Sequence, residues 1–437
     1  MENLLHVELS RFFALFLFFL LVAAIILGGR ISARPIHAFA FFFILQYGPH
    51  TVLKSSLYRH SEFLTDYSHS LYSVLVGLVY AALAVALFTR QGMARRGAGD
   101  LVDMRAEFHV RKGKLILLVF CFIGVALTSL YLSAPSSIIS TNIKFLLGSS
   151  LFSYSELRRE LFVDSAWYQF AAAVRFSLVP ILAASIFGYL ASRNSFLLGF
   201  FVAIVGAIVS AIQLNKFFYL YYLTIFTLVG YSVYTHKVAS YDLRQFGRRH
   251  LFFILIGVIA VAGIYRLYLF QYSEAIASGL LDADRITATM IYRVFYASAD
   301  ALHLWVDYFL FESDPKGLSV IGRICATGLV ECFDANSRIP QIYLGEYQTT
   351  LQVGFIGTGL AMGGIIGAII VILLTVLIVF IADLEAERVM HAGAGAVVVP
   401  LLSICMFFLC TRDLHTATLS GGLVFALLYS RTYSKAA

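Results

Sequence analysis

Residues 291–319 read IYRVFYASADALHLWVDYFLFESDPKGLS, and residues 347–370 read YQTTLQVGFIGTGLAMGGIIGAII. The first stretch places polar side chains on one face of a predicted helix, whereas the second leads into a long apolar run. Acidic residues that do not simply flank an apolar segment are concentrated in this region. We predict that the apolar segments elsewhere in the chain cross a membrane, hold this region on one side of it and build a pocket beneath it.

The composition is typical of a membrane protein with many helical spans. Of 437 residues, 60% are hydrophobic and 13% are charged, and the mean hydropathy is +0.84. A helical span needs about 20 apolar residues, so a polytopic protein accounts for this excess. We interpret Phe12–Leu27 as a retained first span, because no small-residue cleavage site follows it closely. No glycine-rich nucleotide-binding loop is visible, which argues against ATP-driven chemistry.

The hydropathy pattern predicts an all-α polytopic fold with about 11 transmembrane helices and one large loop that contains amphipathic helices. We divide the chain into residues 1–270 with eight spans, residues 271–350 with the loop and the candidate site, and residues 351–437 with three spans. The predicted spans are residues 10–28, 36–53, 69–89, 115–133, 166–191, 195–213, 217–234, 251–270, 351–381, 394–410 and 414–430.

Lys and Arg residues are distributed unevenly between the predicted loops. One set of loops contains the basic residues between Arg90 and Lys114 and the group between Lys237 and Arg249. Loops rich in Lys and Arg stay in the cytoplasm, and this set includes the C-terminus. The N-terminus and the loops at 134–165 and 271–350 are therefore predicted to face away from the cytoplasm. The net charge of +7 follows from these loops and is not a nucleic-acid signal.

Four polar residues within the quoted region share one helical stripe: Arg293, Asp300, His303 and Asp307, with spacings of 7, 3 and 4. Two interpretations stay open. The stripe is the solvated face of a helix that lies along the outer membrane surface with its apolar side down. Alternatively it is a site, in which a guanidinium binds a phosphate and either Asp300 or His303 accepts a proton from a hydroxyl.

Further candidates are cations at or near predicted spans. Arg175 lies inside the fifth span, where a charge is expensive unless it faces water or an anion; the alternative is that it extends toward the headgroups. Lys216 occupies the turn between spans six and seven, and Arg266 lies near the end of span eight. Together with Arg293, these cations would surround the phosphates of a diphosphate.

The large loop contains candidates for binding a polar acceptor and a candidate disulfide. The polar candidates are Glu331, Asp334, Arg338, Glu346 and Tyr347. Cys325 and Cys332 are seven residues apart, and they can form a disulfide if the loop lies outside the cytoplasm. No second pair of metal ligands is near them, so no metal site is predicted. The glycines of VGFIGTGLAMGG are predicted to allow close helix packing rather than to bind phosphate.

Three segments resemble the bacterial polymerases that join repeat units of O-antigen and related surface polysaccharides (Wzy-type). YRVFYASADALHLWVDYF (292–309) is similar to the family's helix with an arginine and many aromatic residues, and QTTLQVGFIGTGLAMGGIIGAI (348–369) to its glycine-rich start of the span after the large loop. SAIQLNKFFYLYYL (210–223) resembles its turn with a basic residue. The likeness covers roughly residues 205–375. In QTTLQVG, Gln348 and Gln352 depart from the Asn/Asp-Gly pattern that family members often have.

The resemblance implies a fold like that of the lipid-dependent GT-C glycosyltransferases and a multi-pass protein of the bacterial inner membrane, with its N-terminus in the periplasm and its C-terminus in the cytoplasm. The implied reaction is inverting, metal-independent transfer of one undecaprenyl diphosphate-linked oligosaccharide to another at the periplasmic face. The implied roles are diphosphate binding by Arg175, Lys216, Arg266 and Arg293 and proton acceptance by Asp300 or His303. The implied partners are lipid-linked oligosaccharides, membrane lipids and a chain-length-regulating co-polymerase; no cofactor and no nucleic acid are expected.

Two other functions fit the same features. An O-antigen ligase resembles the polymerase in fold and donor, but transfers the glycan to the lipid A core. A flippase or other transporter of lipid-linked oligosaccharides is the second alternative, although it predicts charged residues in several spans and internal repeats, which are not evident here.

Overall fold

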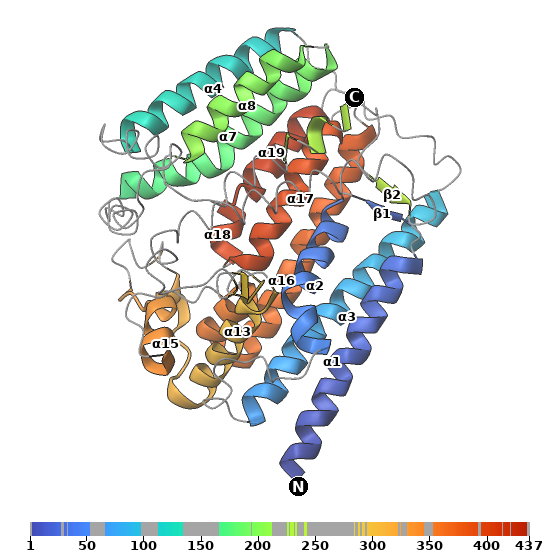
Figure 1. Ribbon diagram of the computed structural model, residues 1–437, viewed down its shortest axis with the longest axis vertical. Coiled ribbons are helices and arrows are strands. Elements are labelled where there is room, and N and C mark those ends of the chain that lie inside the picture. The colour runs from blue at the N-terminus through green and yellow to red at the C-terminus, as the bar shows by residue number, and fades with distance from the viewer. Residues whose placement is uncertain are drawn as a thin grey trace. The chain divides into compact units, whose positions relative to one another are not determined.

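The structure is a computed structural model, and it is almost entirely helical where its placement is described (Figure 1). The segments described are residues 2–27, 30–32, 34–52, 66–97, 112–133, 166–193, 195–211, 225–226, 228–230, 232–233, 240–242, 284, 287–288, 291–292, 295–321, 324, 330–344, 353–391, 395–412, 414–419 and 421–434.

Within these segments, the only strands are two short ones, β1 (Arg30–Ser32) and β2 (Ser240–Asp242). A π-helical turn, η3 (Tyr308–Glu312), and a 3-10 helix, η4 (Gly317–Val320), follow α13. The α-helices are α1 (Glu2–Leu27), α2 (Pro35–Val52), α3 (Asp66–Gly97), α4 (Lys112–Ser133), α7 (Ala166–Ser192), α8 (Phe196–Ala211), α13 (Ala297–Asp307), α15 (Ala335–Leu344), α16 (Phe355–His391), α17 (Gly395–Thr411), α18 (Leu414–Leu419) and α19 (Leu423–Ser434).

Three helices are long and apolar enough to cross a membrane: Glu8–Ile26 in α1, Tyr67–Gly92 in α3 and Phe355–Met390 in α16. Shorter apolar helices occupy four more of the predicted spans, at Leu115–Thr128, Ser177–Ser192, Leu197–Gly206 and Gly395–Thr411. The predicted span at 251–270 lies outside the described residues, and that at 217–234 is described only in part. The helices thus identify a membrane protein, while the number of 11 spans and the large outer loop stay predictions.

The chain forms two compact units that alternate along the sequence. Unit 1 comprises Met1–Val102, Ile291–Leu384 and Cys405–Thr418; unit 2 comprises Asp103–Met290, Glu385–Ile404 and Leu419–Ala437. Unit 1 contains α1 to α3, α13, α15 and most of α16. Unit 2 contains α4, α7, α8 and α19. The region quoted at the start of the sequence analysis falls mainly in unit 1.

Aromatic side chains form the core of unit 1. Phe43 of α2 stacks on Tyr47 with 4.5 Å between ring centroids and meets the ring of Tyr80 on α3 edge-on at 5.5 Å. Phe355, at the start of α16, lies 6.2 Å from Phe43. Tyr80 also contacts the ring of Phe18 on α1. These large buried rings hold α1, α2, α3 and α16 together by dispersion and area burial.

The glycine-rich start of α16 reverses the chain direction. Gly363 and Gly364 have non-helical backbone angles, and Gly364 has a φ of 62°. A Cβ on Gly359 would lie 2.7 Å from the Cα of Ala368, whereas nine residues of continuous helix would separate these positions by about 13 Å. The segment 355–362 therefore packs back against the helix that follows it. The predicted role of these glycines in close packing is confirmed for Gly359, whose carbonyl lies against Gly367, but the predicted uninterrupted span across them is wrong.

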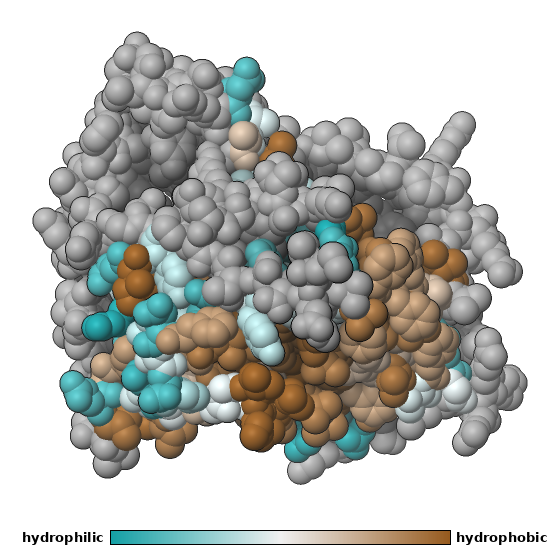
Figure 2. All heavy atoms as spheres, turned by 90° about the horizontal axis from the view of Figure 1, so that it is seen from below, coloured by the Kyte–Doolittle hydropathy of each residue, from teal (hydrophilic) through white to brown (hydrophobic). Residues whose placement is uncertain are grey.

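After this bend, α16 is still long enough to span a bilayer and presents an apolar face outward. Residues 365–390 extend about 39 Å as a helix. Ile366, Ile370, Leu373 and Leu377 are all more than half exposed, at helical spacing. Figure 2 shows hydrophobic side chains next to one another over much of the coloured surface, with hydrophilic ones gathered in another part. Such a stripe on a long helix is what contact with lipid requires.

Unit 2 has its own helix packing. α7 packs against both α4 and α8, and α19 also contacts α7. Gly422, which has a φ of 83°, precedes α19 and lies against Ser177 of α7, where an added Cβ would meet the Ser177 Cα at 3.2 Å. Ser430 of α19 donates a hydrogen bond of 2.9 Å to Glu385.

Candidate active site

The helix α13 is buried on every side. All residues from Ala299 to Asp307 are buried, and they include the predicted polar residues Asp300, His303 and Asp307. Their exposed fractions are 6%, 1% and 5%. The prediction of a helix that lies on the membrane surface with a solvated polar face is therefore wrong for α13. Leu302 and Leu304 are buried as well, because α2, α3 and α15 all pack against this helix.

The two oxygens of Asp300 face side chains from two different parts of unit 1. Tyr292, which lies just before α13, donates its hydroxyl to Asp300 Oδ2 at 2.5 Å. His50, in the last turn of α2, places its Nε2 atom 4.0 Å from Asp300 Oδ1. A carboxylate held from two directions has a defined orientation. Tyr292 is partly exposed, so Asp300 lies close to the surface of the unit.

His303 lies deeper, within a group of aromatic and imidazole rings. Its Nδ1 donates a hydrogen bond to the Ala299 carbonyl at 2.9 Å, so in the neutral ring Nε2 is the acceptor. The ring stacks on Tyr72 of α3 with 3.5 Å between centroids and an interplanar angle of 21°. The rings of His50 and His69 lie 4.8 Å and 5.1 Å away. Burial, and after it the nearby His50 and His69, hold the pKa of His303 well below its usual value.

Asp307 anchors the other end of α13. It accepts hydrogen bonds from Ser68 at the start of α3 and, at 2.9 Å, from the hydroxyl of Tyr343 on α15. Burial and this hydrogen bond raise the pKa of the Tyr343 hydroxyl, because the bond needs the protonated phenol. Asp307 thus ties three helices together.

Several buried polar atoms near His303 have no hydrogen-bond partner in the described part of the chain. They are Tyr72 Oη, Tyr47 Oη and Gln46 Oε1. Gln46 precedes His50 by one helical turn on α2, and Tyr72 stacks on His303. Burial of such atoms without a partner is unfavourable, and water or a polar ligand group commonly binds there.

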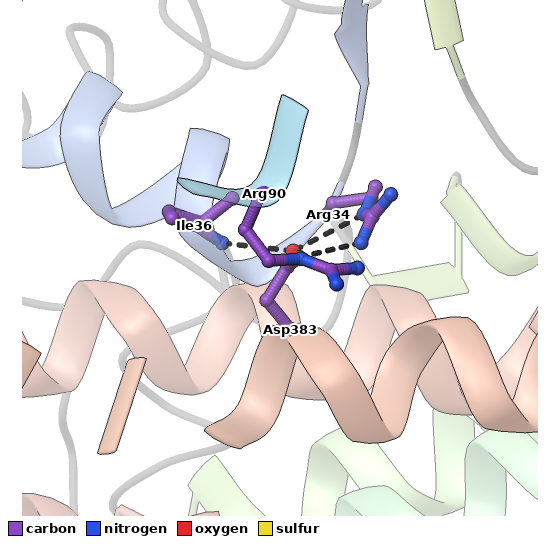
Figure 3. Close-up of polar contacts among 4 residues, drawn as sticks. All are labelled: Arg34, Ile36, Arg90 and Asp383. Atoms are coloured by element: carbon purple, nitrogen blue, oxygen red, sulfur yellow. Dashed lines mark hydrogen bonds and ion pairs between the residues drawn. The ribbon is translucent and has the colours of Figure 1, made fainter. Parts of the chain in front are cut away.

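A second polar cluster occupies the opposite end of α2 and α3 (Figure 3). Asp383 of α16 is fully buried and receives hydrogen bonds from Arg34 at 2.5 Å and 3.1 Å and from Arg90 at 2.9 Å. The Ile36 amide also points at Asp383, at 3.5 Å. About 20 Å of α2 separates Ile36 from His50, so the two clusters are about two thirds of a bilayer core apart.

The structure describes only part of the predicted site. Asp300 and His303 lie together, as the helical stripe predicted. Arg175 lies in α7 of unit 2, and its side chain is not among those described. Asp334 and Arg338 are exposed at the start of α15, where Ser337 donates a hydrogen bond of 2.6 Å to Asp334, and Glu331 is exposed before it. The predicted residues outside the described segments are Lys216, Arg266, Arg293, Cys325, Glu346 and Tyr347.

The described cysteines differ in their bonding state. Cys332 is disulfide-bonded, whereas Cys121, Cys405 and Cys410 are free; the predicted partner, Cys325, lies outside the described residues. Within the segments that the structure describes, no group of three or more His, Cys, Asp or Glu side chains is arranged to hold a metal ion.

His50, Tyr72 and Tyr292 were not among the predicted site residues. They are 8 to 250 positions away from Asp300 in the sequence, and periodicity relates only neighbours on one helix. One signal was present: Gln46 and His50, one turn apart, interrupt an apolar helix, and polar side chains there need a buried partner.

Comparison of the chain with models of known protein families found no match, and neither comparison with curated proteins nor comparison with solved structures found one.

Proposed function

We propose that this chain is a membrane glycosyltransferase that polymerises undecaprenyl diphosphate-linked oligosaccharide repeat units at the periplasmic face of the bacterial inner membrane. The observation that carries the proposal is the buried group around Asp300, at one end of a helical unit with membrane-spanning helices. Lipid-linked substrates present their reacting groups at this depth, next to the headgroups.

In the proposed reaction, a terminal hydroxyl of one lipid-linked glycan attacks the anomeric carbon of another. The new bond joins the hydroxyl oxygen to that carbon, and the bond from the carbon to the diphosphate oxygen breaks with its electron pair leaving on the diphosphate. The hydroxyl proton moves to Asp300. A single displacement inverts the anomeric configuration, and it needs a base and a cationic site for the leaving group rather than a metal.

Between the two predicted bases, the environment favours Asp300. His303 is 1% exposed, its Nδ1 bonds a backbone carbonyl, and its ring is covered by Tyr72. Asp300 is the more accessible of the two, and it is next to the partly exposed Tyr292. We therefore propose that Asp300 accepts the proton and that His303 supports the site by packing beneath it.

We assign the binding of the leaving diphosphate to cationic side chains. Arg293 directly follows Tyr292, whose hydroxyl binds Asp300, so a bound diphosphate at Arg293 would lie near the base. The family resemblance assigns diphosphate binding to Arg175, Lys216 and Arg266 as well, which belong to unit 2. Guanidinium and ammonium groups offset the charge that develops on the leaving oxygen. The acceptor glycan is assigned to the exposed polar residues Glu331, Asp334 and Arg338 and to Glu346 and Tyr347.

The test is a reconstituted reaction. Purified protein in lipid nanodiscs is incubated with an undecaprenyl diphosphate-linked repeat unit, and the products are separated on a gel. The native protein should give a ladder, and Asp300→Asn should lower its rate by about 10²–10⁴-fold, the usual contribution of a general base. Asp307→Asn is the matched control, because it changes a carboxylate of the same helix that binds structural hydroxyls, and it should retain turnover per folded molecule. Undiminished extension by Asp300→Asn would exclude Asp300 as the base.

The same system separates the other functions. Product that forms only when lipid A core is added identifies a ligase. Movement of the lipid-linked glycan across the membrane of a sealed vesicle, with no new glycosidic bond, identifies a transporter. Arg293→Ala should abolish extension while the protein still inserts into the membrane; normal long chains from that variant would refute its role.

A further inference from the structure

We infer that Tyr292, Asp300 and His50 act as one proton-handling unit, in which Tyr292 fixes the orientation of the Asp300 carboxylate and His50 exchanges protons with it. This inference rests on the proposed function for its catalytic part. The pairing itself stands on the geometry alone and can be tested without substrate.

The geometry assigns a different task to each oxygen of the carboxylate. Oδ2 is occupied by the Tyr292 hydroxyl at 2.5 Å. Oδ1 faces His50 Nε2 at 4.0 Å, an ion-pair distance that a small side-chain rotation shortens to a hydrogen bond. A substrate hydroxyl therefore meets a carboxylate that cannot rotate freely. The carboxyl proton that results has an imidazole beside it as the next acceptor.

His50 is itself held in place by rings from two other helices. Its ring lies 5.1 Å from that of Tyr72 and 4.8 Å from that of His303. The side-chain exposures of His50 and Asp300 are only 10% and 7%, so water screens the pair weakly. A buried imidazole binds a proton weakly, so a proton that Asp300 passes to His50 is released again after the diphosphate has left.

Other titratable groups face the pair and set its background charge. Among the described residues they include His303 on α13 and Tyr72 and His69 on α3, and the charge of Arg11 on α1 acts on His50. Asp307, at the other end of α13, accepts hydrogen bonds from Ser68 and Tyr343. The Tyr343 hydroxyl on α15 and the Asp307 carboxylate are thus a second phenol–carboxylate pair, and they supply a matched control.

The direct test measures protonation of Asp300 by infrared spectroscopy. Protein labelled with ¹³C-aspartate is titrated without substrate, and subtraction of the Asp300→Asn spectrum isolates the Asp300 carboxyl band. Loss of a hydrogen bond to a carboxylate makes it easier to protonate. Tyr292→Phe should therefore raise the proton affinity of Asp300 roughly tenfold, and His50→Phe should raise it by a smaller factor. Tyr343→Phe should leave the Asp300 band unchanged.

The catalytic part is tested by the pH profile of turnover in the reconstituted reaction. Tyr292→Phe should move the acidic limb of kcat to higher pH by about one unit, whereas Tyr343→Phe should not move it. An Asp300 band that titrates alike in the native protein, Tyr292→Phe and His50→Phe overturns the inference, whatever the activity. A shifted band in a protein that makes no glycosidic bond retains the pairing and removes the proposed function.

Discussion

A buried carboxylate lies at each end of α2 and α3, but the two carboxylates have different kinds of partners. At one end, Asp383 lies between the guanidinium groups of Arg34 and Arg90, and its oxygens are bonded at 2.5–3.1 Å. At the other end, the described contacts of Asp300 come from a phenol and an imidazole. Figure 1 shows α13 and β1 at opposite ends of these helices.

We propose that the difference separates a structural cluster from a reactive one. A carboxylate between two permanent cations stays ionised and fixed, because neither guanidinium releases a proton. A carboxylate beside tyrosine and histidine has neighbours that change protonation state or donate without a full charge. Burial at both ends strengthens these interactions, so the choice of partner decides the role of each acid.

The largest effect is expected from breaking the charged cluster. Asp383→Ala leaves the Arg34 and Arg90 charges together without their carboxylate, and we expect a loss of about 3–5 kcal/mol in the free energy of unfolding. Equilibrium unfolding in mixed micelles measures this. Glu8→Gln, which changes an exposed acid on α1, should alter stability by less than about 0.5 kcal/mol. Equal stability of the two variants would remove the structural role of Asp383.

The next effect concerns the bend that brings α16 against α13. A Cβ on Gly367 would lie 2.3 Å from the Gly359 carbonyl oxygen, so Gly367→Ala must push two backbones apart. We expect a loss of about 1–3 kcal/mol, read from the same unfolding curves. Gly363→Ala adds a methyl group where nothing lies within 4 Å and serves as the control. A neutral Gly367→Ala would contradict the close approach.

The third effect is a loss of stability at acidic pH, which we expect from the end of α2 and α3 that contains His303. The pKa of His303 is lowered in the folded protein, so the unfolded chain binds the additional proton first as the solution becomes acidic. Stability is therefore complete well above pH 6.5 and falls as the pH drops below it. His303→Phe keeps a ring against Tyr72 and should remove that part of the acid loss. An unchanged pH dependence in the variant would show that His303 does not stay neutral.

The smallest effect is expected at the far end of α13. Tyr343→Phe removes one of two hydroxyl donors to Asp307, and Ser68 remains. We expect a loss of about 1 kcal/mol in unfolding free energy, with no change in the pH profile of glycosyl transfer. A change in that profile would mean that Asp307, and not only Asp300, takes part in proton transfer.

Local patterns in the sequence predicted the parts of this fold that depend on one helix. The long apolar runs of α1, α3 and α16 predicted candidate spans, and the spacing of Asp300 and His303 predicted their common location. The partners of these residues come from distant segments, which no periodicity connects. Arg90 was predicted on the cytoplasmic side from charge, but the partner that it shares with Arg34, Asp383, follows only from packing.

The reversal at Gly363 was missed for a different reason. The mean hydropathy of an apolar run is the same whether the run forms one straight helix or turns back at two glycines. It therefore carries no information on the direction of the chain. What decides the reversal is steric: Gly364 adopts a φ of 62°, and Gly359 and Gly367 allow backbone contact. Hydrophobic length alone therefore joined two antiparallel segments into one predicted span.

The reversal within α16 also affects how many of its apolar residues contribute to a membrane span. The eight residues Phe355–Met362 extend only about 12 Å, less than half of a bilayer core, so this segment is too short to cross one. The backbone polar groups at the ends of this segment must form hydrogen bonds with protein instead of water. One such bond runs from the Lys316 amide to the Ala361 carbonyl, at 2.7 Å. We predict that a cysteine placed at the exposed Gly363, just after this short helix, reacts with an impermeant label from one compartment only.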